Sequence, residues 1–168
     1  MEMNIRLATA EDCAALASVK TAYVRTLFRG ILTQQELKLV APENYRDTIA
    51  AAIEAPGRQV LVLQEPDRIA AYVIFGADPE EPGYGMIFDC AFAMDCDHEH
   101  RDRMMTMAVN MMADAGMDQV HFWLMRENFF ARFQLESFGF KEEGILRNLG
   151  EGDHEMQMMR YLYRTRQS

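Results

Sequence analysis

Apolar residues recur along this chain with two spacings, one typical of helices and one typical of strands. Between Ala14 and Ile31 they return every three or four residues, which predicts one helix, or two helices broken near Gly30. The helical spacing predicts three further helices, over 45–53, 101–115 and 128–138. Glycines suited to end the last two helices follow them, at Gly116 and Gly139.

Alternating or β-branched runs between these helices predict seven strands. They cover 4–8, 58–64, 69–75, 84–93, 120–125, 140–145 and 154–162. Turn-forming residues 65–68 join the second and third runs into a hairpin. The strand–helix–strand unit over 84–125 predicts a right-handed crossover between two parallel strands. The order β-α-α-β-β-β-α-β-α-β-β therefore predicts a mixed α/β (α+β) fold with a largely antiparallel sheet.

Composition narrows the class of protein further. The 168 residues are 49% hydrophobic and 26% charged and contain no linker, which predicts a single globular domain over 1–168. No apolar run is long enough to span a membrane, and the first residues lack the pattern of a signal peptide. Three widely spaced cysteines favour a reduced, cytoplasmic protein. The net charge of −9 argues against nucleic acid as a partner.

The segment from Asn128 to Phe140 carries the clearest resemblance to a known family. It reads as a helix capped by Asn128, containing Ala131 and closing on Gly139-Phe140. This helix resembles the one that follows the fifth strand in the GNAT superfamily of acyl-CoA N-acyltransferases. The segments "IRLATAEDCAALASV", "LFRGILTQQEL" and "RIAAYVIFG" are similar to further GNAT elements in the same order. The resemblance covers nearly the whole chain.

The resemblance implies a central mixed sheet with splayed parallel strands flanked by helices, and acetyl-CoA as the cofactor. It implies direct transfer of the acetyl group to a small-molecule amine or a peptide amino group. The cofactor positions that it implies are the strand end Ala91, Phe92 and Ala93, the loop and helix start His98, Glu99, His100, Arg101 and Arg103, and the later helix start Asn128 and Ala131. A homodimer is compatible with the resemblance.

The loop before the helix at 101–115 departs from the GNAT pattern. In the family, a Q/R-x-x-G-x-G/A loop lets phosphates approach bare backbone N–H groups at a helix start. Here Glu99 and Arg101 stand in the glycine places, and no glycine lies between Gly85 and Gly116. Four acids against two arginines give 95–103 a net charge of −2 with histidines neutral. The alternative function is therefore a catalytically degenerate GNAT-like domain that binds a ligand or a partner.

The sequence does not predict a metal site in the same loop. Aspartates and histidines are dense there, at Asp95, Asp97, His98, His100 and Asp102. Their spacing matches no compact zinc pattern, and histidines two residues apart diverge on a helix. The expected role of these residues is a charged loop that caps the following helix.

Candidate acid and base groups are few. Many GNAT enzymes take a proton from a tyrosine of the helix before "GF", and that position holds Leu135. Asp89 lies in the apolar strand at 84–93, where burial would raise its pKa and suit it to act as a base. A hydrogen-bonded structural aspartate is the other interpretation. Tyr23, Phe28 and Arg29 are candidates to line an acceptor cleft, with arginine favouring a carboxylate-bearing substrate.

Overall fold

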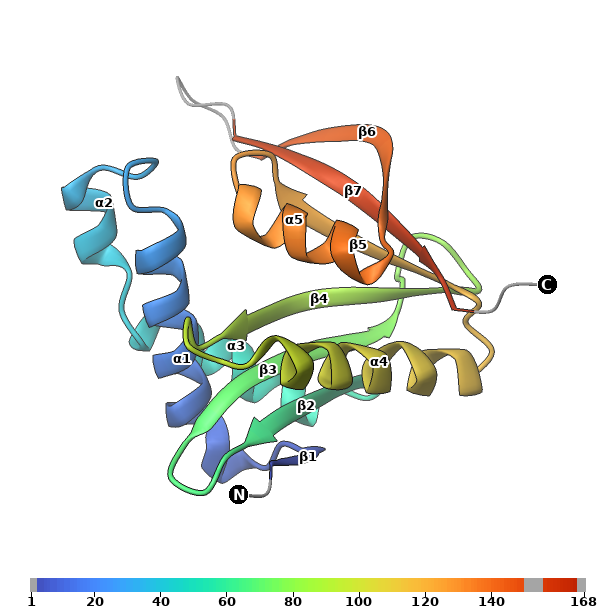
Figure 1. The fold of residues 1–168 in the computed structure, drawn as a ribbon, viewed down its shortest axis with the longest axis horizontal. Coiled ribbons are helices and arrows are strands. Elements are labelled where there is room, and N and C mark those ends of the chain that lie inside the picture. The colour runs from blue at the N-terminus through green and yellow to red at the C-terminus, as the bar shows by residue number, and fades with distance from the viewer. Residues whose placement is uncertain (1–2, 150–155, 166–168) are drawn as a thin grey trace.

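A seven-stranded mixed sheet forms the centre of the protein, as seen in a computed structural model that describes residues 3–149 and 156–165 (Figure 1). The strand order is β1-β2-β3-β4-β5-β7-β6. All neighbours pair antiparallel except β4 and β5, which run parallel. The strands are β1 Asn4–Leu7, β2 Arg58–Gln64, β3 Ile69–Ala77, β4 Tyr84–Phe92, β5 Gln119–Met125, β6 Lys141–Leu149 and β7 Met156–Arg164.

Helices cover both faces of this sheet. They are α1 Cys13–Leu27, α2 Gln34–Leu39, α3 Glu43–Glu54, α4 His98–Asp114 and α5 Phe129–Phe138, with a short 3-10 turn at Ala10–Asp12. Helix α4 lies in front of β2 and β3, and α5 lies in front of β5 (Figure 1). Helices α1 and α3 pack together behind the sheet. In the part of the chain that the structure describes, no helix is both long and apolar enough to cross a membrane.

Local signals in the sequence place most of these elements correctly. The hairpin of β2 and β3 turns where expected, with the Glu65 N–H donating to the Arg68 carbonyl at 2.8 Å. Helix α5 is capped by Asn128, whose side-chain oxygen accepts from the Ala131 N–H at 3.2 Å, and it ends at Gly139 with a φ of 125°. The expected start of the last strand, at 154, lies outside the described residues.

Two helix predictions need correction. Helix α4 begins at His98 rather than 101, because Asp97 caps it by accepting from the Glu99 N–H at 2.8 Å. The sequence reading also missed α2, a six-residue helix that starts from a capping box of Thr33 and Glu36. None of the residues of α2 is buried. The hydrophobic spacing that predicts a helix was therefore absent there.

The parallel pairing of β4 and β5 confirms the predicted crossover. Pairing covers only four residues of each strand, from Tyr84 with Gln119 to Ile87 with Phe122. Beyond this point the two strands separate. The register of β4 against β3 slips at the same place, since Asp89 faces Ile74 while Ile87 faces Phe75. Phe88 is thus the extra residue of a β-bulge, which bends β4 away from β5.

Candidate active site

Two cavities meet where β4 and β5 separate. The first, here called the slot, is narrow, with a volume of about 30 Å³. It is lined by Tyr23, Cys90, Phe92, His98, Arg101, Asp102, Met105, Phe122, Ala131, Gln134, Leu135 and Phe138. The second, here called the cleft, holds about 400 Å³. It is lined by Lys20, Tyr23, Val24, Phe28, Leu32, Val40, Tyr45, Phe88, Asp89, Cys90, Phe122, Trp123, Leu124, Met125, Asn128 and Met158. Tyr23, Cys90 and Phe122 line both.

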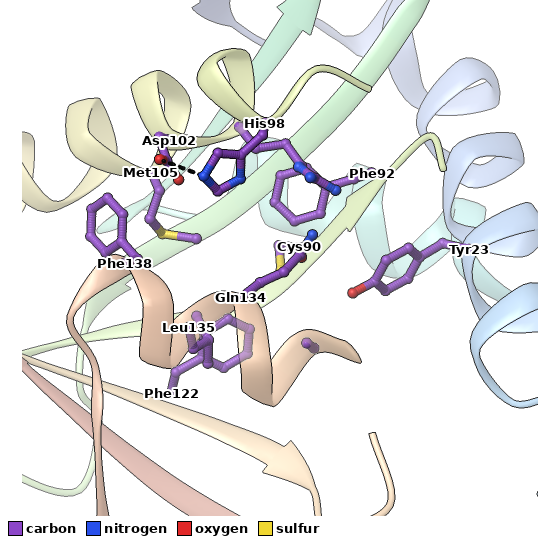
Figure 2. Close-up of a pocket in the computed structure, with 12 residues that line it drawn as sticks. Tyr23, Cys90, Phe92, His98, Asp102, Met105, Phe122, Gln134, Leu135 and Phe138 are labelled. Atoms are coloured by element: carbon purple, nitrogen blue, oxygen red, sulfur yellow. Dashed lines mark ion pairs between the residues drawn. The ribbon is translucent and has the colours of Figure 1, made fainter. Parts of the chain in front are cut away.

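The slot contains polar atoms that have no partner. The Nε atom of Arg101 and the Nε2 atom of Gln134 are both buried without a hydrogen bond among the described residues. Figure 2 shows Gln134 and Leu135 entering the slot from α5, opposite His98 and Asp102 of α4. Buried polar atoms in native proteins are nearly always paired. Two unpaired donors in one slot therefore indicate a place for a ligand that carries acceptor atoms.

The start of α4 is strongly charged. The Asp97 carboxylate accepts a hydrogen bond from the Glu99 N–H of the first turn. The imidazole of His98 lies 3.3 Å from the carboxylate of Asp102. Arg101 points toward α5, with its guanidinium 6.0 Å from the ring of Phe130. Arg103 instead lines an open groove on the outer side of α4. The two arginines that the sequence grouped as phosphate ligands thus lie on different sides of the helix.

A half-buried ion pair lies on one wall of the cleft. Lys20 of α1 donates to the Asp89 carboxylate at 2.6 Å, and the Tyr72 hydroxyl donates to the other carboxylate oxygen at 2.7 Å. The side chains of Lys20 and Asp89 are 18% and 31% exposed. The bulge at Phe88 places Asp89 and Ile87 on opposite faces of the sheet, although they stand two residues apart. Asp89 therefore faces α1 and is compensated by two donors.

Protonation states follow from these contacts. Burial lowers the pKa of Lys20, but the Asp89 carboxylate outweighs this effect and the pKa is raised, so the ammonium stays charged. Burial, then the Asp89 charge, raise the pKa of Tyr72, which stays a hydrogen-bond donor. Burial raises the pKa of Cys90 to about 12, which leaves it a protonated thiol and a poor nucleophile.

Tyr23 occupies the junction of the slot and the cleft. Its side chain extends from α1 with the hydroxyl directed toward Cys90 and Gln134 (Figure 2). Burial raises its pKa well above the ordinary value, although a hydrogen bond with Asn128 lowers it in part. Asn128 caps α5 next to this junction, with its side-chain oxygen accepting from the Ala131 N–H. The Tyr23 hydroxyl therefore stays protonated at the junction of the two cavities.

The sequence alone matches no protein-family model, and a search of curated proteins finds no match. Solved structures do match. PaiA N-acetyltransferase from Thermoplasma acidophilum, solved with coenzyme A, has a TM-score of 0.78 at 15% identity, over 97% of this chain and 100% of that one. The yncA protein of Salmonella typhimurium, with its cofactor acetyl-CoA, has a TM-score of 0.71 at 16% identity, over 100% and 96%.

A GNAT-family acetyltransferase from Streptococcus pneumoniae has a TM-score of 0.65 at 16% identity, over 97% of this chain and 99% of that one. The chain has the GNAT acetyltransferase fold. The mixed sheet, the splayed strands and the helices expected from the sequence resemblance are therefore confirmed.

Five of the ten residues expected at a cofactor site line the two cavities. Phe92, His98, Arg101 and Ala131 line the slot, and Asn128 lines the cleft beside it. Ala91 is fully buried in β4. The remaining expected residues line neither cavity: Ala93, whose N–H donates to the Ala70 carbonyl at 2.7 Å, and Glu99, His100 and Arg103.

Of the expected acceptor-site residues, Tyr23 and Phe28 line the cleft, whereas Arg29 is exposed and lines neither cavity.

Sequence reasoning missed Lys20, Gln134 and Trp123. One signal could have found Lys20. It stands at helical spacing from Leu16, Tyr23 and Val24, on the apolar face of α1, where a lysine requires a buried partner.

Proposed function

We propose that this protein is an acetyl-CoA-dependent N-acetyltransferase that acts on a small-molecule amine or a peptide amino group by direct transfer. The observation that carries the proposal is the junction between β4 and β5, where a slot with unpaired buried donors meets a separate cleft. Direct transfer needs such a junction, because the acyl donor and the amine must enter from different sides. GNAT-fold neighbours with coenzyme A or acetyl-CoA bound support this assignment.

The described residues fit the pantetheine part of the cofactor better than its phosphates. The β4 edge beyond Ile87 is unpaired with β5, so its backbone polar groups are available on that side. Asn128, Ala131 and Gln134 would flank the chain of the cofactor, and Arg101 and His98 would face its phosphates. When bound, acetyl-CoA supplies a thioester whose acetyl group passes to nitrogen.

Amide formation from an ammonium group requires the nitrogen to lose two protons, while the leaving sulfur gains one and solvent takes the other. The acceptor ammonium must lose a proton before its nitrogen can attack, and we assign this proton to the Asp89 carboxylate, directly or through water. When the C–S bond breaks, the leaving sulfur must gain a proton, which we assign to the Tyr23 hydroxyl. The second proton of the attacking nitrogen then restores Tyr23, and Asp89 releases the first to water. Tyr23 lies beside Asn128 and takes the role that the Leu135 position cannot fill. No covalent enzyme intermediate is needed, in line with the protonated Cys90.

Mixing the protein with acetyl-CoA and an amine tests the function directly. We expect free thiol and N-acetylated amine to appear in equal amounts. Thiol titration measures the first product, and mass spectrometry measures the second. The three cysteines are buried thiols, consistent with our proposal that the enzyme works in the cytoplasm. Acetyl-CoA that binds but is never consumed with any amine would instead favour the noncatalytic alternative.

The charged start of α4 is the specific observation that favours that alternative, a GNAT-shaped domain that binds without catalysis. The Asp97 carboxylate accepts from one N–H of the helix start, and Glu99 adds a second negative charge in the first turn. Both acids repel a phosphate at this helix end. A side-chain clamp by Arg101 would offset this repulsion, which makes Arg101 the decisive residue.

Arg101→Ala is expected to weaken acetyl-CoA binding by about tenfold or more, because a charge-assisted hydrogen bond contributes about 1.5–3 kcal/mol. Wild-type affinity should fall steeply with added salt, and this dependence should be shallower in the variant. Calorimetry at several salt concentrations measures both. Arg103→Ala is the matched control, since Arg103 faces the outer side of α4. Equal losses in the two variants would show that only the overall charge of the helix matters.

Leu135→Ala should cost stability rather than chemistry. Leu135 is 5% exposed and donates no proton, so truncation is expected to lower the free energy of unfolding by about 2–5 kcal/mol. The turnover number of the folded fraction should stay near that of the wild type. Denaturant titration and steady-state kinetics separate the two. A folded variant with collapsed turnover would mean that this position of α5 serves the reaction after all.

A further inference from the structure

The wall of the cleft is apolar over most of its extent. Its apolar lining comes from α1 and the segment after it, from the two separated strands and from β7, and includes Phe28, Leu32, Val40, Phe88, Trp123 and Met158. Lys20 and Asp89 are the charged residues of the lining, and they neutralise each other at 2.6 Å. The cleft thus presents no uncompensated charge to what enters it.

The two arginines beside Trp123 do not change this balance. Both lie against its ring, but each is already paired. Arg147 bonds to Glu80, and Arg160 bonds to Glu81 and Glu143. Arg29, which favoured a carboxylate-bearing substrate in the sequence, is exposed and lines neither cavity.

We infer that the acceptor is a primary amine carried on an uncharged, apolar body, such as an alkylamine or an arylalkylamine. The inference rests on the proposed function and specifies its acceptor. The ammonium group would bind at Asp89, whose side chain is 31% exposed. Each carboxylate oxygen accepts from one donor, Lys20 or Tyr72, and keeps a further lone pair. The body would lie against the apolar wall, in a cleft of about 400 Å³, which suits a single ring or a short alkyl chain.

A second charge on the acceptor is unfavourable for a physical reason. A far ammonium or carboxylate group would be buried against Phe28, Leu32 and Val40 without a partner, and desolvating an unpaired charge is costly. A carboxylate next to the amine would compete with Asp89 for Lys20, which the 2.6 Å ion pair already engages. Polyamines, amino acids and acidic peptides are therefore disfavoured by the same wall that favours apolar amines.

Trp123 is the single tryptophan of the chain and lines the cleft, so its fluorescence reports amine binding without any need for turnover. Two matched pairs of probes isolate the second charge: hexylamine with 1,6-diaminohexane, and phenethylamine with phenylalanine. Titrated into the wild-type protein with and without coenzyme A, each apolar amine should bind at least about tenfold tighter than its charged match. Equal or tighter binding of the charged members, or no saturable change with any amine, would overturn the inference.

Leu32→Asp places a carboxylate on the half-buried part of the wall and provides a second test. It should weaken hexylamine binding and tighten 1,6-diaminohexane binding, reversing the preference. Leu7→Asp, on exposed β1 away from the cleft, is the matched control and should keep the wild-type order. An unchanged order in a folded Leu32→Asp protein would count against the inference.

These outcomes are separable from those of the proposed function. If the amines bind with the expected order but acetyl-CoA does not bind, the acceptor inference stands and the enzyme proposal falls. If acetyl-CoA is consumed with 1,6-diaminohexane in preference to hexylamine, the enzyme proposal stands and the inference falls.

Discussion

Tyr23→Phe is expected to lower kcat by about 10²–10⁴-fold, the usual contribution of a positioned general acid, while KM for both substrates changes little. We propose the hydroxyl of Tyr23 as the proton donor, because it is buried at the junction of slot and cleft, beside the cap residue Asn128. Removing one oxygen leaves the apolar packing of the ring in place. Stopped-flow detection of free thiol, with binding measured separately, distinguishes a loss in chemistry from a loss in affinity.

The pH dependence provides a second signature of Tyr23. A general acid acts only while protonated, and burial raises the Tyr23 pKa above its usual value near 10. The wild-type rate should therefore not fall on the alkaline side until the pH exceeds about 10. Tyr163→Phe, in the aromatic cluster with Phe138 and Phe140, is the matched control. Comparable kcat losses in both variants would show that the effect is structural.

Asp89→Asn should reduce kcat/KM by about 10²-fold or more, because the amide neither attracts the acceptor ammonium nor takes its proton. The same change removes the partner of Lys20 and is expected to lower the free energy of unfolding by about 1–3 kcal/mol. Kinetics and thermal unfolding on the same samples report both effects.

The double variant Lys20→Met/Asp89→Asn separates the two roles of Asp89. With both charges gone, no unpaired charge remains in the cleft, so stability should recover toward the wild type. The rate should not recover, because no carboxylate is present. Recovery of rate together with stability would show that Asp89 serves only as the structural partner of Lys20.

Elements with local signals were predictable from the sequence. The cap at Asn128, the stop at Gly139 and the turn at 65–68 depend on residues adjacent in the chain, and all three are where expected. The parallel pairing of β4 and β5 also followed from local patterns, since the connecting helix has the length of a crossover.

Features that depend on tertiary register were not predictable. Burial of Asp89 was expected from an apolar strand, but the bulge at Phe88 turns the carboxylate toward Lys20, 69 residues away in sequence. The sequence could not show this bulge, because it arises from the mismatch of β4 with β3. Arg101 lines the slot, whereas Arg103 lines a groove on the other side of α4. This difference depends on the start of α4 at His98, three residues earlier than the hydrophobic spacing indicated.

We propose that the slot and the junction of β4 and β5 bind acetyl-CoA despite the glycine-free, acidic start of α4. A calorimetric titration of the wild-type protein with acetyl-CoA at low salt tests it most directly. We expect a saturable isotherm with one site per chain, weakened by Arg101→Ala and unaffected by Leu7→Asp. An absence of saturable heat at millimolar acetyl-CoA, confirmed by an unchanged thermal midpoint, would contradict it.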